Sequence, residues 1–416
     1  MEGKHIIVIG GGTYRMRNMW SDAEGYGIKI ILVEYDPNHI ARDFVHCFVE
    51  YDFSDHTIDH VHASEIISLL RRREIKADGC VSFCNECTPL AALICEQLEL
   101  RGPSFKSAII ANSKSQTQNL LKMSNIEILG CKNYFQFPAI LKLDNCSGGI
   151  GACMVESKSE LKNKFQQITS SLCTDSDFPR IGLSRGNSMT TFEFYNGTEH
   201  NVDVMLYDKT LVWAFITDSG IVRQPYFIGT AKRMPSFLPD DSRNQLIDAA
   251  YKCCIGIGLT DGTFNVEFIM TANGPKLVEI NPRMCGYVFR DWIMKLYGID
   301  IMLYTMMISC GIKPELPNIS TDIIQMGVMV IPSLHGKLLT DDQYRNKLNE
   351  MIDAGDVTFL QFLESFEHLS TYDKPFGNVA VSGTDSIEVK TKLMNVCRAL
   401  DIDQHDYQVD IFIRNF

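Results

Sequence analysis

The stretch that most constrains this fold is FNVEFIMTANGPKLVEINPR, at residues 264–283. Apolar and polar residues alternate in two short runs, which an Asn-Gly-Pro turn separates. This pattern predicts a β-hairpin with strands at residues 264–270 and 276–280. Side chains alternate between the two faces of a strand, so one face of the hairpin is apolar and the other is polar. The predicted apolar face consists of Val266, Phe268, Val278 and Ile280.

The pairing of these strands places two carboxylates face to face. If Met270 lies opposite Lys276, Glu267 lies opposite Glu279, and Asn281 returns to the same face. Facing carboxylates repel each other, and a divalent cation removes that repulsion. Two carboxylates and an amide oxygen form a hard oxygen site of the kind that Mg²⁺ completes with water and phosphate oxygens. A solvated hairpin with a chance pair of glutamates is the alternative.

The composition limits the class of protein. The 416 residues are 45% hydrophobic and 22% charged, which is ordinary for a globular protein of two or three domains. The net charge of −12 argues against nucleic acid or an anionic membrane surface as a partner. We find neither a secretory signal nor an apolar run long enough to cross a bilayer, and we expect the 14 cysteines to be reduced thiols. These features predict a cytoplasmic protein.

The two ends of the chain predict separate units. Residues 1–108 alternate short buried strands with helices, which is typical of an open α/β domain. Residues 326–416 predict an α+β unit with strands at residues 326–331 and 407–413 and a helix at residues 389–400.

Two features of the first unit could bind a ligand. Glycines 10–12 follow the first strand and Glu34 ends the second, as in a dinucleotide site, but the motif would need a glycine at Arg15. A tight strand-to-helix turn is the alternative. Glu86 follows the third strand, at the edge where open α/β sheets bind ligands. Capping of the next helix is an equal alternative for Glu86.

Two lysines accompany a glycine-rich loop. Lys114 lies in the first turn of an expected helix, where a cation opposes the helix dipole unless it binds an anion. Lys142 lies on an expected strand at residues 137–143, which runs into the loop. Glycines allow backbone N–H groups to approach phosphate oxygens, and the lysine adds a positive charge. The glycines are Gly148, Gly149 and Gly151. A plain hairpin turn is the alternative.

The order of these features resembles that of the ATP-grasp superfamily, whose members clamp ATP between two α+β subdomains. After the glycine loop come an acidic two-stranded segment at residues 193–206 and then Glu-x₁₁-Glu-x-Asn-x-Arg. The segments NSKSQTQNLL, YNGTEHNVDV, DGTFNVEF and EINPRMCGYVFRDWIMKLYGIDI also resemble the catalytic half of carnosine synthases, and the likeness extends over nearly the whole chain. Carnosine synthases differ by a further N-terminal half, and by paired glycines where this chain has Cys285-Gly286.

The resemblance implies an ATP-grasp fold of mixed α/β and α+β class. Residues 1–108 would precede an ATP-grasp domain at residues 109–325, and the C-terminal unit at residues 326–416 would follow it. A lid subdomain is expected at about residues 135–200 within the ATP-grasp domain.

The resemblance also implies roles for individual residues. The implied ATP contacts are Lys114, Lys142, Gly148, Gly149, Gly151, Glu193, the backbone near Phe194 and Tyr195, and Glu199. The implied metal ligands, for Mg²⁺ or alternatively Mn²⁺, are Glu267, Glu279 and Asn281. The implied catalytic groups are Arg283 and Lys142. The implied substrate contacts are Glu86, Arg283, Tyr287 and Arg290, and for Glu86 and Arg290 a purely structural role is equally open.

The reaction implied by the resemblance joins two amino acids through a peptide bond. ATP would activate a carboxylate as an acyl phosphate, an amine would attack it, and ADP and phosphate would leave. The implied pair is β-alanine or γ-aminobutyrate with L-histidine, which gives a carnosine-like dipeptide. The alternatives are an ATP-grasp ligase for other amino acids and a non-catalytic nucleotide-binding protein. The expected partners are small amino acids, and a homo-oligomer is left open.

Overall fold

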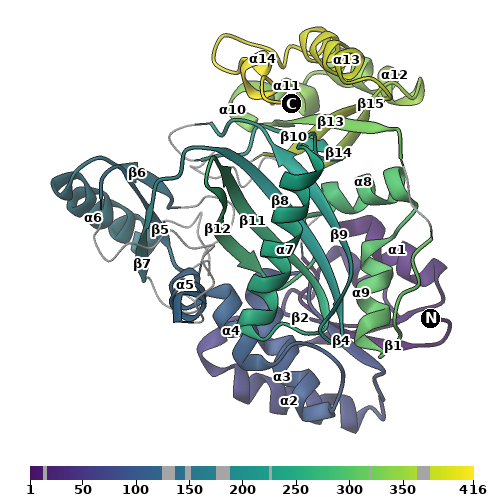
Figure 1. The fold of residues 1–416 in the computed structure, drawn as a ribbon. Coiled ribbons are helices and arrows are strands. Elements are labelled where there is room, and N and C mark those ends of the chain that lie inside the picture. Colours follow the sequence, from purple (N-terminus) through teal and green to yellow (C-terminus); the bar gives the residue numbers. More distant parts are fainter. Residues whose placement is uncertain are drawn as a thin grey trace.

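A computed structural model gives the fold of residues 1–12, 16–123, 136–145, 151–174, 188–223, 227–317, 321–362 and 375–416. Within these ranges the chain forms three β-sheets with helices packed around them (Figure 1). No helix in these ranges combines the length and the apolar character needed to cross a bilayer. The expected mixture of α/β and α+β structure is confirmed.

The N-terminal domain is an open parallel sheet with helices on both faces. Its elements are β1 (His5–Ile9), α1 (Arg17–Gly25), β2 (Lys29–Glu34), β3 (Cys47–Glu50), α2 (Asp59–Arg72), β4 (Gly79–Val81) and α3 (Thr88–Leu98). The strands lie in the order β3-β2-β1-β4, and all pairs are parallel. α1 covers the face that buries Val8, and α2 and α3 cover the face that buries Ile7. This arrangement brings the carboxyl ends of the strands to one edge.

A small antiparallel sheet forms a separate arm at one side of the molecule (Figure 1). It contains β5 (Ala139–Leu143), β6 (Cys153–Val155) and β7 (Met189–Glu193), in the order β6-β5-β7, with α6 (Lys158–Thr174) against it. We call this arm the lid. Two helices, α4 (Phe105–Asn112) and α5 (Lys114–Met123), lie between it and the N-terminal domain in the chain.

The central sheet carries the predicted hairpin. It includes β8 (Thr198–Tyr207), β9 (Thr210–Ser219), β10 (Ala231–Met234), β11 (Gly262–Thr271) and β12 (Gly274–Asn281). The helices of this region are α7 (Asp240–Ile257), α8 (Tyr287–Tyr297) and α9 (Ile301–Ser309). α7 packs on one face of the sheet, where its apolar stripe meets Val202, Val266 and Phe268. The opposite face is therefore available for polar side chains.

The C-terminal unit extends the central sheet. Its elements are β13 (Ile324–Val330), α10 (Pro332–His335), α11 (Lys337–Thr340), α12 (Asp342–Asp353), β14 (Thr358–Gln361), β15 (Gly377–Gly383), α13 (Ser386–Ala399) and α14 (Val409–Phe412). Because β13 pairs with β10, eight strands lie in the order β12-β11-β8-β9-β10-β13-β15-β14. The strand predicted at residues 407–413 is wrong. Val409, Phe412 and Ile413 are buried at helical spacing, and a short helix forms instead.

The hairpin register is confirmed in one half and wrong in the other. Glu267 faces Glu279 as predicted, but Ile269 rather than Met270 faces Lys276. A β-bulge between these two positions inserts one extra residue into β12. Leu277 is therefore buried under α7, whereas Val278, which we had predicted on the apolar face, is only half-buried.

One apolar core is shared by the N-terminal domain and helices α8 and α9. It joins Val8 and Trp20 of the first domain to Trp292 of α8 and Met302 of α9. These side chains are at most 4% exposed. The two parts thus share one packed interior.

Candidate active site

The polar face of the central sheet gathers most of the predicted site. The register places Asn201 of β8 opposite Glu267 of β11, and Glu267 opposite Glu279 of β12. Two residues further along each strand, on the same face, a second row consists of Asp203, Asn265 and Asn281. Two parallel rows of carboxylates and amides therefore cross three neighbouring strands, opposite the face that packs on α7.

Asn281 lies between the two facing glutamates. Its amide nitrogen lies 3.4 Å from Oε1 of Glu267 and 3.3 Å from Oε1 of Glu279, so it donates to both carboxylates. Burial and the neighbouring Glu279 raise the pKa of Glu267 to about 8. Two carboxylates held this close favour the binding of a proton or a cation between them.

The donor set fits a small hard cation. Within the described ranges, no group of three or more His, Cys, Asp or Glu side chains is arranged to hold a metal ion. Glu267 and Glu279 offer carboxylate oxygens on one face, and Asn281, whose amide nitrogen donates to both, would add its oxygen by rotation of the side-chain amide. This incomplete shell suits Mg²⁺, which keeps several waters and shares phosphate oxygens with its substrate.

Two lysines, one in helix α5 and one in strand β5 of the lid, lie near Glu279. Nζ of Lys114, in the first turn of α5, lies 3.1 Å from Oε2 of Glu279, and both side chains are largely buried. Lys142 of β5 lies close to the same carboxylate. Burial lowers the pKa of Lys142, the neighbouring Lys114 lowers it further, and Glu279 and Glu267 partly oppose this effect. Burial raises the pKa of Glu279, but the two lysines outweigh burial and hold it below its usual value.

A third lysine, which the sequence analysis missed, completes the cationic side of the site. Nζ of Lys232 in β10 donates to Oγ of Ser219 at 2.5 Å and lies 3.7 Å from Oε1 of Glu199. It also lies near Glu267 and counteracts the raised pKa of that carboxyl. β10 has only four residues, too few to show the alternation of apolar and polar side chains that marks a strand, so the sequence did not point to Lys232. The burial of Lys232 marks it as a site residue, but burial can be known only from the tertiary structure.

The connection between the lid and the central sheet brings in the predicted adenine contacts. β7 and β8 belong to different sheets, so the two-stranded unit predicted at residues 193–206 is wrong, and residues 194–197 form the link. Glu193 and Phe194 are exposed, and Tyr195 is half-buried. At Gly197 an added Cβ would come within 2.1 Å of the Met270 carbonyl oxygen, so the link packs closely against β11.

The glycine-rich loop is only partly within the described ranges. Gly148 and Gly149 lie outside them. Gly151 has φ +67°, and an added Cβ would come within 2.9 Å of the Leu143 side chain. A glycine is therefore required where the chain returns to the lid sheet.

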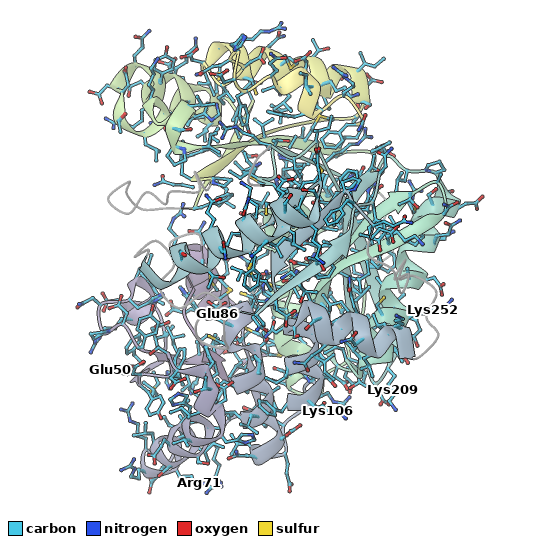
Figure 2. All side chains as sticks on the ribbon, turned by 90° about the vertical axis from the view of Figure 1, so that its left-hand side faces the viewer. Glu50, Arg71, Glu86, Lys106, Lys209 and Lys252 are labelled. Carbon is cyan, nitrogen blue, oxygen red and sulfur yellow. The ribbon has the colours of Figure 1, made fainter. Side chains whose placement is uncertain are left out.

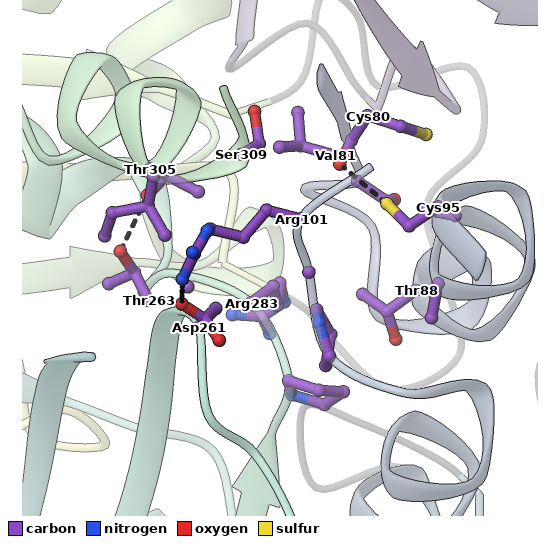
Figure 3. A pocket seen from close by; sticks show the side chains of 18 of the residues that line it. Cys80, Val81, Thr88, Cys95, Arg101, Asp261, Thr263, Arg283, Thr305 and Ser309 are labelled. Carbon is purple, nitrogen blue, oxygen red and sulfur yellow. Dashed lines mark hydrogen bonds and ion pairs between the residues drawn. The ribbon is translucent and has the colours of Figure 1, made fainter. Parts of the chain in front are cut away.

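Arg283 follows β12 and borders a cavity between the N-terminal domain and β11. Its Nη1 donates to the Met284 carbonyl oxygen at 2.8 Å. The cavity has a volume of about 50 Å³, and Arg283 lies on one side of it with the ion pair between Arg101 and Asp261 (Figure 3). Thr88 lines the cavity from the N-terminal domain. Arg283 thus lies where the two domains meet.

Arg290 is engaged in a structural network. Its guanidinium donates to both carboxylate oxygens of Asp300, at 2.9 and 2.6 Å, and to Asp22 of α1 at 2.7 Å. Tyr26 donates to Asp300 at 3.0 Å, and Asp300 caps the N-terminus of α9. These contacts favour the structural alternative for Arg290 over a contact with a substrate carboxylate.

The other predicted substrate contacts are less constrained. Glu86 is exposed and lies on the side of the N-terminal domain toward the rest of the molecule, away from Glu50 and Arg71 (Figure 2). Tyr287 begins α8, and its side chain lies outside the described structure.

The dinucleotide reading of the first strand finds no support in the geometry. Both carboxylate oxygens of Glu34 accept backbone N–H groups, from Gly11 at 2.6 Å and from Tyr35 at 2.8 Å. Gly10 and Gly12 have φ near +79° and +76°. The buried carboxylate therefore closes a tight turn, as the alternative interpretation predicted.

A buried acid that the sequence analysis did not assign lies beside Arg283. Oδ1 of Asp203 accepts the Cys285 backbone N–H at 2.9 Å and the Asn265 amide at 3.3 Å. Its Oδ2 has no hydrogen-bond partner within the described ranges. Burial raises the pKa of Asp203 to about 7, although these hydrogen bonds and the charge of Arg283 work in the opposite direction.

Comparisons with known proteins agree with this geometry. A family model for the ATP-grasp domain matches residues 135–291. Carnosine synthase 1 of Mus musculus is 36% identical over 100% of this chain and 53% of the mouse protein. A solved L-amino acid ligase from Bacillus licheniformis superposes with a TM-score of 0.73 at 15% identity, covering 96% of this chain and 98% of that one. An ADP complex of N5-carboxyaminoimidazole ribonucleotide synthetase gives a TM-score of 0.69 at 14% identity, covering 98% and 99%.

The chain spans about half the length of the curated relatives it matches. The structural likenesses, at about 15% identity, establish the fold.

Proposed function

Because this chain belongs to the carnosine synthase-like ATP-grasp family, we propose that it is an ATP-dependent ligase that joins two amino acids by a peptide bond. The observation that carries this proposal is the pair Glu267 and Glu279, which face each other with Lys114 bound to the second carboxylate. Cations and carboxylates alternate here in a buried site, as the binding of a metal-complexed polyphosphate requires.

The residues present would divide the work as follows. Glu267, Glu279 and Asn281 would hold Mg²⁺, which when bound neutralises negative charge on the phosphates during phosphoryl transfer. Lys114 and Lys142 would bind phosphate oxygens, and binding would replace the ion pair between Lys114 and Glu279. The link at residues 194–197, with Glu193, would contact adenine, and Glu199 the ribose.

The acyl group would be activated beside Arg283. A carboxylate substrate would take the γ-phosphoryl group of ATP and become an acyl phosphate, and ADP would leave. The amine of the second amino acid would then attack the acyl carbon and release phosphate. Arg283 would steady the carboxylate and the acyl phosphate through charge-assisted hydrogen bonds. Because acyl phosphates hydrolyse in water, the site needs the lid above it.

The substrate pair we propose is β-alanine or γ-aminobutyrate with L-histidine. Its support is the likeness to carnosine synthase 1 over the whole of this chain. Glu86 would bind an ammonium group, since it lies on the side of the N-terminal domain that faces the rest of the molecule. An ATP-grasp ligase with other amino-acid substrates is the second candidate, and the substitution of Cys285 for a glycine favours it.

The test is amino-acid-dependent release of phosphate from Mg·ATP. The purified chain is given β-alanine with L-histidine, each amino acid alone, and then a panel of other pairs, with mass spectrometry of the products. Phosphate and a β-alanyl-histidine mass that appear only with both amino acids would establish the ligase and its pair. Turnover with a different pair keeps the reaction and replaces the substrates. Binding of ATP without turnover for any pair contradicts the proposal.

A further inference from the structure

We propose that Asp144 is a positioning residue that holds the two phosphate-binding lysines, Lys114 and Lys142, in a fixed relation to each other. This inference rests on the proposed function, because it assigns a role within the same ATP site. Asp144 follows Lys142 by two residues, at the end of β5, and is 5% exposed. No role was assigned to Asp144 from the sequence.

Asp144 makes four hydrogen bonds to the N-terminal end of α5. Its Oδ1 accepts the Ser115 backbone N–H at 2.7 Å. Its Oδ2 accepts the hydroxyl groups of Ser113 at 2.7 Å and Ser115 at 2.9 Å. Its own carbonyl oxygen accepts the Lys114 backbone N–H at 3.3 Å. The side-chain carboxylate and the backbone carbonyl of Asp144 thus both bind the first turn of α5, which carries Lys114.

These contacts join two different parts of the structure. β5 belongs to the lid sheet, between β6 and β7. The backbone N–H of Asp144 also donates to the Ser188 carbonyl oxygen at 2.9 Å, next to β7. α5 belongs to the body, because Leu121 is fully buried in the apolar core that α7 and the central sheet share. Asp144 is therefore a bridge between the lid strand that carries Lys142 and the body helix that carries Lys114.

The charge of Asp144 suits this role. Lys114 is buried at the positive end of the α5 dipole, and the half-buried Lys142 lies nearby, so the arrangement concentrates positive charge before any phosphate is bound. A carboxylate at the helix N-terminus offsets part of this charge and satisfies backbone N–H groups that the helix leaves unpaired. Hydrogen bonds to a charged group are also stronger than neutral ones. The geometry thus preorganises both lysines, which reduces the ordering needed when ATP binds.

The test measures the binding of Mg·ATP, without amino acids, by isothermal titration calorimetry. Binding by the wild type comes first, since its absence would contradict the proposed function rather than this inference. We expect Asp144→Ala to raise the Kd for Mg·ATP at least tenfold. Asp144→Asn should stay within about threefold of wild type, because its amide oxygen can keep the Ser115 N–H and the serine hydroxyls can rotate toward its NH₂. The KM values for the amino acids should change less than threefold in both.

A matched control separates positioning from loss of a helix cap. Asp385 caps α13 in the C-terminal unit by accepting the N–H groups of Ile387 and Glu388, each at 2.9 Å. Asp385→Ala should lower Tm, as Asp144→Ala should, and leave the Kd for Mg·ATP unchanged. Ser115→Ala removes only one hydroxyl group, and with it we expect a Kd about threefold above wild type even if Asp144→Ala does not fold.

Three results would overturn the inference. The first is a wild-type Kd for Mg·ATP in Asp144→Ala, or in Ser115→Ala if the former does not fold. The second is equal weakening by Asp385→Ala, which would attribute the effect to general stability. The third is an Asp144→Asn variant as weak as Asp144→Ala, because a side chain that keeps these hydrogen bonds would then not hold the lysines in place.

Discussion

Replacement of Asp203 by asparagine should change how the stability of this protein depends on pH. In the folded chain burial raises the pKa of Asp203 to about 7, whereas the ordinary value is 3.8. Between these two values the folded state keeps a proton that the unfolded state has released, so stability falls as pH rises. The destabilisation is absent below about pH 4 and complete above about pH 7. An asparagine side chain carries no charge at any of these pH values, so the Asp203→Asn variant loses this dependence.

The size of the effect follows from the two pKa values. Between pH 5 and pH 8 the linkage relation gives about 2.5 kcal/mol of lost stability in the wild type relative to Asp203→Asn. For 416 residues the unfolding entropy is about 0.9 kcal/mol/K. The Tm of the wild type should therefore fall by about 3 °C relative to the variant over this pH range. An amide can still accept from the Cys285 N–H and the Asn265 amide, so the cost of the substitution itself is the same at both pH values.

The assay is thermal unfolding followed by circular dichroism at pH 5, 6, 7 and 8. Asp385→Asn, at an exposed helix cap, reports how a surface substitution of the same kind behaves over this range. A constant difference in Tm between wild type and Asp203→Asn from pH 5 to pH 8 would refute the reasoning. It would mean that the hydrogen bonds from Cys285 and Asn265, with the charge of Arg283, offset the burial completely.

Three further outcomes are expected at the site and around it. Glu279→Gln removes a proposed metal ligand and the charged partner of Lys114. Phosphate-release kinetics should show a loss in kcat/KM of about 100-fold or more, since the neutral Gln cannot balance the charge of both Lys114 and the proposed Mg²⁺. Removal of divalent cations with EDTA should abolish turnover, and Mg²⁺ or Mn²⁺ should restore it in the same assay; turnover in EDTA would contradict the metal assignment. Arg290→Met leaves the buried Asp300 without its cationic partner, which costs about 3–5 kcal/mol and should lower Tm by about 3–6 °C. A large rise in the KM for an amino acid would instead return Arg290 to the substrate site.

The local pattern of the hairpin was sufficient to predict the pairing of Glu267 with Glu279. Alternation and a turn fix which face each side chain takes, and this information is contained in 20 residues. It did not predict the bulge, because one extra residue in β12 is compatible with the same alternation near Glu279. Because of that bulge, Leu277 is buried in the core where we had predicted Val278.

Features that depend on tertiary structure were beyond the sequence. Asn196-Gly197 looks like a hairpin turn, but the glycine is needed for close approach to β11, and the flanking strands lie in different sheets. Lys232 and Asp203 face the site only because β10 and β8 join one sheet with β11. Arg290 carries no local signal that distinguishes a substrate contact from its network with Asp300.

The shared apolar core has a consequence for any attempt to change specificity by recombination. A boundary at residue 108 invites the exchange of residues 1–108 for the equivalent segment of a relative with another substrate. Such a chimera would set foreign side chains against Trp292 and Met302, which now pack with Val8 and Trp20. Mismatched volumes in a close-packed interior cost stability whether they leave cavities or clashes. A successful graft must therefore carry α8 and α9 along with the first domain, so the unit of exchange is discontinuous in sequence.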